Sequence, residues 1–205
     1  MTAAKNSVLL SVITVVATLV PGLAPVVPAA GVLLRVTPAV RAIIGGLRQI
    51  DVPLAWRKKN WIGDRGQGSC VHAALVHLFH WQGRHDLGDW WAAQYANGET
   101  AQGLAAKLEA AGVRFAETRS GDEAFLEWAI RTRRGAAVVV QNGAHMVNLV
   151  GLDRQHAHLL DSNSPAQIEM WPRERFLRDW KQSGGWAVTP VGAPSPPDPW
   201  IVKGR

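Results

Sequence analysis

The chain has 205 residues and only one cysteine, Cys70. One cysteine cannot form a disulfide within the chain, so the fold must be stable without one, and a reduced thiol fits either the cytoplasm or an envelope compartment. Charge is also missing from one long stretch, because no Asp, Glu, Lys or Arg lies between Lys5 and Arg35. A lone thiol and a charge-free N-terminal stretch are therefore the first two features to explain.

The N-terminal segment, residues 1–50, has the composition of a membrane-targeting sequence. Residues 8–20 form an unbroken run of apolar, Ser and Thr residues behind the basic Lys5, and small residues follow near Ala29. This order matches a secretory signal, while the whole charge-free span is long enough for an uncleaved anchor, although its prolines weaken the second half as a helix. A segment packed on the domain or on a partner is the third interpretation. We expect the protein to be membrane-associated or exported in a bacterial-type envelope.

Positive charge is in excess, since 22 Lys and Arg residues face 16 Asp and Glu residues, for a formal net charge of +6. Most of the basic residues are scattered and no nucleic-acid-binding motif accompanies them, so we expect no nucleic-acid partner. Attraction to anionic lipid or to an acidic partner is the simpler explanation. Several basic residues, Arg35 and Arg41 first, follow the apolar span, which favours the cytoplasmic side for an anchor and argues against efficient export of a cleaved signal. The side of the membrane stays open.

The lone cysteine lies where a glycine-rich turn ends and an apolar helical pattern begins, in residues 66–75, GQGSCVHAAL. A thiol at a helix N-terminus faces unpaired backbone N–H groups and the positive end of the helix dipole, which lower its pKa. The alternative interpretation is a buried apolar cysteine. Cys70 is therefore a candidate nucleophile, provided that a base lies nearby.

A candidate base lies downstream, in residues 136–153, where two β-rich runs are joined by a Gln-Asn-Gly turn and His145 opens the second run. A third strand, residues 156–161, ends in Asp161, and Asn163 follows closely. A thiol at a helix start, a histidine at a strand start and a carboxylate or amide at the end of the next strand form a nucleophile, a base and an orienting group. Asp161 and Asn163 are both candidates for the third role.

This ordered set resembles the papain-like cysteine peptidases, and the C39-like bacterial branch more than papain itself. Residues 70–75 are similar to the family's Cys-hydrophobic-x-Ala-Ala-Leu helix, and residues 145–153, HMVNLVGLD, to its His-x-Val-x-x-Val-Gly-x-Asp strand. An Asp-Pro-like turn, a Phe-x-x-x-Trp helix and a closing strand are echoed at residues 161–165, 176–180 and 185–191. The resemblance implies a catalytic triad of Cys70, His145 and a third residue.

For the third residue, Asp161 has the spacing from His145 that is typical of the family, so we favour it. Asn163, followed by Ser164, looks instead like the Asn-Ser pair of papain and remains the alternative.

The oxyanion hole departs from the family pattern. Family members usually carry a Gln about six residues before the nucleophile, and its side-chain amide helps to bind the oxyanion, but this chain has Asp64 there. Either Gln67 serves from a shorter spacing, or backbone N–H groups, including that of Cys70, carry the oxyanion.

The pattern of helices and strands predicts an α+β fold. Helical patterns at residues 70–81, 86–95, 100–111 and 122–134 come first, apart from a short strand at 113–117, and strands then dominate to the end except for a helix at 172–182. We expect a papain-like domain over residues 56–192, in which a helical subdomain carrying the Cys70 helix packs on an antiparallel sheet carrying His145 and Asp161 or Asn163. A Pro-rich tail, residues 193–205, follows the domain.

The resemblance implies a cysteine peptidase that hydrolyses a peptide bond through a thioester, with a peptide or protein as its substrate. An amidase or acyltransferase with the same triad, and a catalytically inactive papain-like binding module, are the alternatives, because a fold does not decide among them. We expect no cofactor and no metal, since the nearby histidines, His77 and His80, lack a third ligand at a suitable spacing.

Overall fold

The computed structural model describes residues 50–191. The predicted membrane-targeting segment, up to residue 49, and the predicted Pro-rich tail lie outside the described residues. Within residues 50–191, none of the helices combines the length and the apolar character that a bilayer crossing requires. The packed body is already established at residue 50, because Ile50 and Val52 are buried in the core and Ile50 N–H donates to the carbonyl of Val150.

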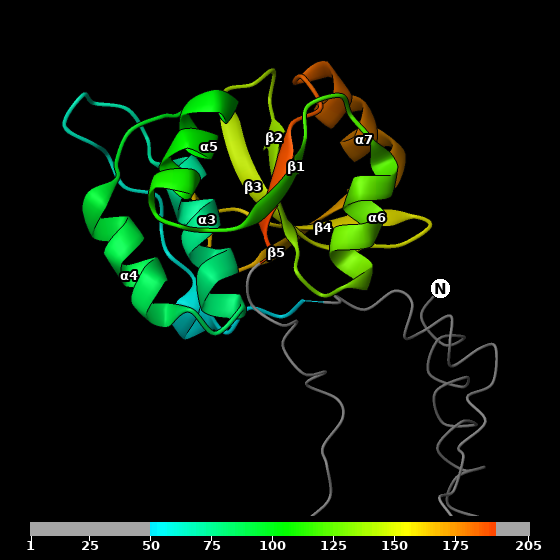
Figure 1. Ribbon diagram of the computed structural model, residues 1–205. Helices are drawn as coiled ribbons and strands as arrows, with labels where there is room; N and C mark the ends of the chain where they lie inside the picture. Colours follow the sequence, from blue (N-terminus) through cyan, green and yellow to red (C-terminus); the bar gives the residue numbers. More distant parts are fainter. Residues whose placement is uncertain (1–49, 192–205) are drawn as a thin grey trace, which may run out of the picture. The chain divides into compact units, whose positions relative to one another are not determined.

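The first half of the described chain is helical, as predicted (Figure 1). Its elements are η1 (Leu54–Trp56), α3 (Cys70–Trp81), α4 (His85–Gln94) and α5 (Ala101–Ala110). Thr100 caps α5, since its side chain accepts a hydrogen bond from the N–H of Gly103. Eleven of the twelve residues of α3 are buried, as expected for a helix that is apolar on all sides. This central helix therefore has little freedom to move, and Cys70 is its first residue.

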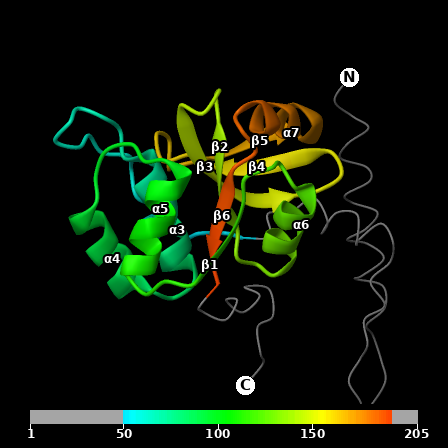
Figure 2. The same cartoon turned by 45° about the horizontal axis from the view of Figure 1, so that its top comes forward.

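An antiparallel sheet of six strands forms the second half, in the order β1-β6-β2-β3-β4-β5 (Figure 2). The strands are β1 (Phe115–Thr118), β2 (Ala136–Val140), β3 (His145–Leu152), β4 (His156–Leu160), β5 (Ile168–Pro172) and β6 (Ala187–Pro190). Every residue of β2 and β3 is buried, so both faces of the middle of the sheet are covered. This arrangement confirms the predicted α+β class.

Helices cover the sheet on its two sides (Figures 1 and 2). On one side α3 contacts β2, β3 and β6, while α6 (Glu123–Arg131) and α7 (Arg173–Gln182) contact the strands from the other. Because α3 packs directly on β3, the helix that begins with Cys70 lies beside the strand that begins with His145.

The predicted Gln-Asn-Gly turn joins β2 to β3. Gln141 and Asn142 have φ angles of 56° and 55°, and Gly143 follows at 86°. Two successive residues with positive φ form the tight turn whose twist matches that of paired strands. The register that results pairs Val140 with His145, which places His145 at the end of the sheet where β3 starts.

Candidate active site

The Cys70 thiol is placed by the first turn of α3. The N-cap residue Ser69 is fully buried, and its hydroxyl accepts a hydrogen bond from the N–H of Asn97, which fixes the entry to the helix. Cys70 itself is 9% exposed. Its sulfur accepts backbone N–H groups of Met146 and Val71, so it faces both the strand and its own helix start.

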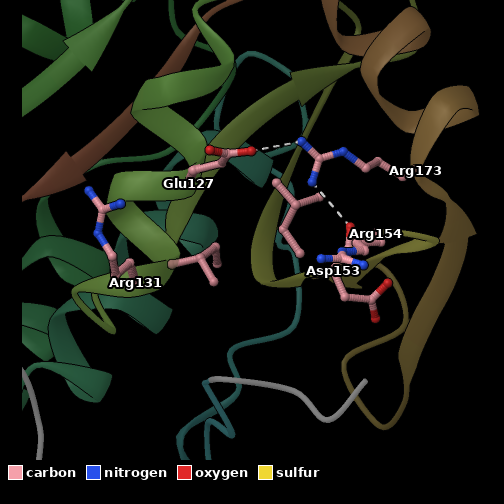
Figure 3. Close-up of a pocket in the computed structure, with 7 residues that line it drawn as sticks. Glu127, Arg131, Asp153, Arg154 and Arg173 are labelled. Carbon is pink, nitrogen blue, oxygen red and sulfur yellow. Dashed lines mark hydrogen bonds and ion pairs between the residues drawn. The ribbon is translucent and has the colours of Figure 1, made fainter. Parts of the chain in front are cut away.

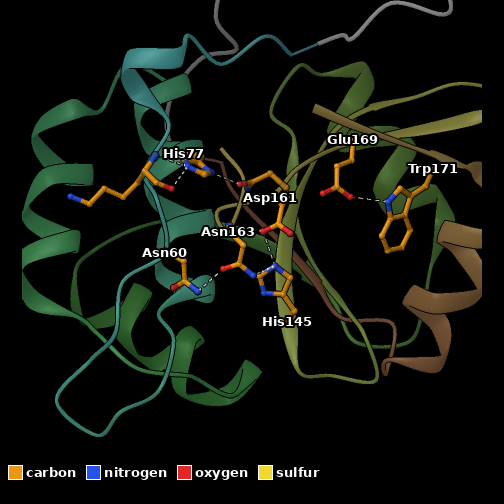
Figure 4. Close-up of polar contacts among 9 residues, drawn as sticks. Asn60, His77, His145, Asp161, Asn163, Glu169 and Trp171 are labelled. Atoms are coloured by element: carbon orange, nitrogen blue, oxygen red, sulfur yellow. Dashed lines mark hydrogen bonds and ion pairs between the residues drawn. The ribbon is translucent and has the colours of Figure 1, made fainter. Parts of the chain in front are cut away.

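His145 contacts both the thiol and Asp161, and Figure 4 shows its side chain beside Asp161 and Asn163. Its Nε2 lies 2.8 Å from Oδ1 of Asp161, and because a carboxylate can only accept, Nε2 carries the proton and donates it. A second side-chain hydrogen bond joins His145 to Cys70. With Nε2 occupied by Asp161, Nδ1 is the nitrogen that remains for the thiol. The structure therefore brings the three predicted residues together in the order thiol, imidazole, carboxylate.

Asn163, the alternative third residue, lies slightly farther from the imidazole. Its Nδ2 is 3.4 Å from Nε2 of His145, while its backbone N–H donates to Oδ1 of Asp161 at 2.7 Å. Its own Oδ1 accepts from Nδ2 of Asn60 at 2.9 Å. The geometry thus favours Asp161 as the group that orients the imidazole, with Asn163 supporting Asp161 from the backbone.

The electrostatics of the site favour a thiolate–imidazolium pair. Burial raises the pKa of the Cys70 thiol, but the hydrogen bond from His145, the backbone N–H groups and the charge of His145 outweigh it, so that the net pKa is lowered. Burial also lowers the pKa of His145, yet its bonds to Asp161 and Cys70 raise it to about 9 overall. Burial raises the pKa of Asp161, but the hydrogen bond from His145, the backbone N–H of Asn163 and the charge of His145 together outweigh it, so that the net pKa is lowered. The proton therefore rests on the imidazole rather than on the thiol.

Gln67, the predicted oxyanion donor, lies in the wall of the same cavity as Cys70 but is turned toward another segment. Its Oε1 accepts from the N–H of Gly98 at 3.3 Å, and the group is exposed. Asp64, at the position where the family has its Gln, accepts from Nδ2 of Asn97 at 2.7 Å. Gln67 therefore joins the loop before Cys70 to the α4–α5 connection.

The triad opens into a cavity of about 970 Å³. Its walls come from three places: the loop before α3, the start of α5, and the β2–β3 turn. Asn60 and the core residue Trp186 also line it. The sequence prediction missed Asn60, which lies too far before Cys70 in sequence to be noticed by spacing.

A second cavity, of about 490 Å³, carries charged side chains but no nucleophile in its lining (Figure 3). Arg173 donates to Oε1 of Glu127 at 3.0 Å and to the carbonyl of Asp153 at 3.1 Å, and thereby joins the first turn of α7 to α6 and the β3–β4 turn. Arg131 and Arg154 complete its rim. Within the lining, Arg173 and Glu127 form an ion pair that joins α7 to α6, which is typical of a structural contact.

A buried polar cluster joins α3 to β3 behind the triad (Figure 4). Asn148 donates through Nδ2 to the carbonyl of Ala74 at 3.0 Å, which leaves its Oδ1 to accept from Nδ1 of His77 at 2.8 Å. Because a backbone N–H can only donate, Nε2 of His77 accepts from the N–H of Lys58 at 2.7 Å, which requires a neutral ring, and burial lowers the pKa of His77 in the same sense. The cluster fixes how α3 lies along β3, and therefore how Cys70 lies beside His145.

Comparison with solved structures places this fold. A putative C39-like peptidase from Bacillus anthracis aligns with a TM-score of 0.55 at 14% identity, over 72% of this chain and 98% of the other. Two looser alignments each have a TM-score of 0.44. One is to a double glycine motif protease from an AMS/PCAT transporter in complex with the leader peptide, at 16% identity over 66% of this chain and 94% of the other. The second is to the peptidase domain of Streptococcus mutans ComA, at 17% identity over 66% of this chain and 99% of the other.

No family model matches the sequence, and no curated protein matches it. The assignment therefore rests on the Bacillus anthracis structure, which at this identity establishes the fold alone. Residues 50–191 have the papain-like fold of the C39-like peptidases.

Proposed function

We propose that this protein is a cysteine peptidase in which Cys70 is the nucleophile. The observation that carries the proposal is the arrangement of Cys70, His145 and Asp161, in which Cys70 and His145 line a cavity large enough for an extended peptide segment. A lone buried thiol is inert, whereas a thiol with a lowered pKa beside an imidazolium is a nucleophile. The fold shared with a putative C39-like peptidase supports the same conclusion.

The reaction begins when the Cys70 thiolate attacks the carbonyl carbon of the scissile peptide bond. The carbonyl π electrons move onto oxygen, and the tetrahedral oxyanion is held by hydrogen-bond donors near the start of α3. As the oxyanion collapses, the C–N bond breaks and the imidazolium of His145 gives its proton to the leaving amine. The product is a thioester on Cys70 and a neutral imidazole.

Water then attacks the thioester while His145 removes one of its protons. The C–S bond breaks, the carboxylic acid is released, and the thiolate–imidazolium pair is restored. Throughout, Asp161 holds the imidazole by Nε2 and stabilises its positive charge, so that Nδ1 keeps pointing to the sulfur. The two steps need no metal or cofactor from the protein.

The test is to replace Cys70. Since it is the only cysteine, an electrophilic thiol probe reports on this residue alone. We expect Cys70→Ala to abolish hydrolysis of a fluorogenic peptide library, with the circular dichroism spectrum unchanged. Residual hydrolysis in Cys70→Ala at the wild-type level would contradict a thiol mechanism, and hydrolysis of cell-wall peptide amides in place of the library would indicate an amidase.

Membrane association remains part of the proposal and rests on composition. The charge-free stretch between Lys5 and Arg35 and the net charge of +6 support binding to an anionic bilayer. Flotation of the full chain with vesicles of anionic or of zwitterionic lipid tests this, and failure to float with both would contradict it.

A further inference from the structure

The loop before Cys70 is a narrow hairpin. Ile62 faces Gly68 in an isolated antiparallel bridge. The N–H of Gly63 donates to the carbonyl of Gln67 at 2.8 Å, and the N–H of Ser69 donates to the carbonyl of Trp61 at 2.9 Å. All three contacts fit one antiparallel pairing, of residues 61–63 with residues 67–69.

The pairing ends at Ser69, because Cys70 already belongs to α3. Asn60 lies two residues before Ile62, so its side chain is on the same face of the hairpin as Gly68, the residue opposite Ile62. A Cβ atom on Gly68 would indeed lie only 3.0 Å from Nδ2 of Asn60. The Asn60 side chain therefore runs along the chain that leads into Cys70.

Asn60 is also anchored to the other side of the site. Its N–H donates to the carbonyl of Ser162 at 2.8 Å, and its Nδ2 donates to Oδ1 of Asn163 at 2.9 Å. Asn163 in turn contacts both His145 and Asp161. Figure 4 shows Asn60, Asn163 and His145 following one another. The amide of Asn60 thus lies between the start of α3 and the turn that carries the third triad residue.

The amide of Asn60 is only partly satisfied. Nδ2 has two N–H groups and one of them goes to Asn163, while Oδ1 is buried and has no partner among residues 50–191. The unpaired Oδ1 only accepts, so a ligand oxygen cannot satisfy it, and the group that bears on the site is the second N–H of Nδ2. A ligand oxygen in the cavity that Asn60 and Cys70 both line would use the free N–H.

We propose that Asn60 supplies the side-chain donor of the oxyanion hole, together with the backbone N–H of Cys70. The assignment rests on the proposed thiol mechanism and replaces the predicted Gln67, whose amide oxygen is engaged by Gly98 in the opposite wall. Asn60 reaches the site through strand pairing rather than through a fixed distance in sequence. It is therefore a catalytic residue that contacts the reacting carbonyl oxygen.

Two reactions of the same thiol separate this role from a structural one. Acetylation of Cys70 by p-nitrophenyl acetate passes through a tetrahedral oxyanion, whereas alkylation by iodoacetamide displaces iodide and forms none. Intact-protein mass spectrometry measures both rates on wild-type protein. We expect Asn60→Ala to lower the acetylation-to-alkylation rate ratio about tenfold or more, since loss of one oxyanion donor typically costs ~10²–10³ in rate.

The comparison variant is Gln67→Ala, which removes the rival amide in the same hairpin, and we expect it to lower the ratio less than Asn60→Ala does, because its Oε1 holds the side chain toward Gly98. Gly68→Ala keeps the Asn60 amide but places a methyl group against it, and we expect a lowered ratio there too. It serves as the second variant if Asn60→Ala does not fold.

Each outcome bears on the assignment. A wild-type ratio in both Asn60→Ala and Gly68→Ala overturns it, and so does a larger loss in Gln67→Ala. If Asn60 acted only by holding Asn163, then Asn163→Ala would lower the ratio as much as Asn60→Ala, and the role would be positioning. A wild-type thiol that reacts with neither reagent would overturn the proposed function itself.

Discussion

At the scale of single residues, the thiol and the imidazole of the triad titrate as a pair. The pKa of Cys70 is lowered, after its burial is offset, by the hydrogen bond from His145, and the pKa of His145 is raised to about 9 by Asp161 and Cys70. Both shifts favour the thiolate–imidazolium form of the pair. The reactivity of the thiol with pH therefore depends on the histidine.

We expect alkylation of wild-type Cys70 by iodoacetamide to proceed well below pH 9, with the rate following thiolate formation. In His145→Ala the burial of the thiol remains without its hydrogen bond and charge partner, so the pKa of Cys70 should rise and the rate profile should shift to higher pH. Stopped-time labelling across pH 5–10 measures both profiles. Identical profiles in the two proteins would contradict the pairing.

The third triad residue is tested by comparing two substitutions. Asp161→Asn keeps the shape of the side chain but removes its negative charge and replaces one acceptor oxygen with an amide donor. We therefore expect kcat/KM to fall by about 10²–10⁴, as when a triad carboxylate is replaced by an amide. Asn163→Ala removes a contact 3.4 Å from Nε2 and should cost about tenfold or less, because the imidazole keeps its charged partner. The opposite order of losses would assign the role to Asn163.

At the scale of secondary-structure elements, α3 and β3 are joined at two points. The first is the contact between Cys70 and His145, and the second is the His77–Asn148 pair, two turns farther along the helix. A helix that is held to a strand at two separated points can neither slide nor rotate. The buried pair thus keeps the nucleophile aligned with its base.

We expect Asn148→Leu to lower the free energy of unfolding by about 1–3 kcal/mol, because it leaves Nδ1 of His77 buried without an acceptor. It should also slow the alkylation of Cys70. The control is Gln82→Leu, another buried polar side chain, which donates to the carbonyl of Pro190 away from the site. Urea unfolding and iodoacetamide kinetics should show a similar loss of stability in both but slower alkylation only in Asn148→Leu.

Elements with strong local signals were predicted well. The helix at residues 70–81 has the predicted bounds, since a glycine-rich turn precedes it and its apolar residues continue to the end. The helix predicted to end at residue 134 instead ends at Arg131, because Arg133 adopts a φ of 58° that no helix allows. Strand β5, Ile168–Pro172, was not predicted: it is a half-buried edge strand without clear alternation, and its pairing with β4 is visible only in three dimensions.

The residues of the candidate site also divide into those with a local sequence signal and those without one. Cys70, His145 and Asp161 each stand at the start or end of a regular element, so their roles follow from order along the chain. Asn60 has no such signal, since its place depends on one isolated bridge and two backbone bonds of the hairpin. Gln67 was predicted as an oxyanion donor because it lies near Cys70 in sequence, but residues close in the sequence of a hairpin can point to different parts of the site.

At the scale of the whole molecule, the dependence of stability on pH reflects two buried histidines whose pKa values are shifted in opposite directions. His72 is fully buried on α3, where it accepts from Nε1 of Trp91 and stacks on Tyr95, and burial lowers its pKa to about 4. The pKa of His145 is raised instead. Below pH 6.5 the unfolded chain binds more protons than the folded one at His72, and above pH 6.5 it binds fewer at His145.

The midpoint of thermal unfolding should therefore fall on the acid side of pH 6.5. It should fall toward pH 4 as His72 must remain neutral in the folded state, a penalty on the order of 2–3 kcal/mol. Between pH 6.5 and about 9 the proton that folding adds to His145 is offset by the one that it removes from Cys70, so this pair should leave the curve nearly flat there. Differential scanning calorimetry between pH 4 and 9.5 measures the curve.

His72→Phe keeps a ring between Trp91 and Tyr95 and should flatten the acid side alone. An acid side as steep as that of the wild type would assign the loss to other groups.

In the hairpin before α3, distance along the chain and distance in space are set by different residues. Residues at its base are held together by register, while residues at its tip, Asp64 and Arg65, set how long the detour between the strands is. Adding or removing a facing pair of residues at the tip changes the count along the chain but not the position of Asn60 beside Gly68. The tip can therefore change in length as long as its contacts with Asn97 are kept or replaced, and active sites built this way are missed by any search that counts residues from the nucleophile.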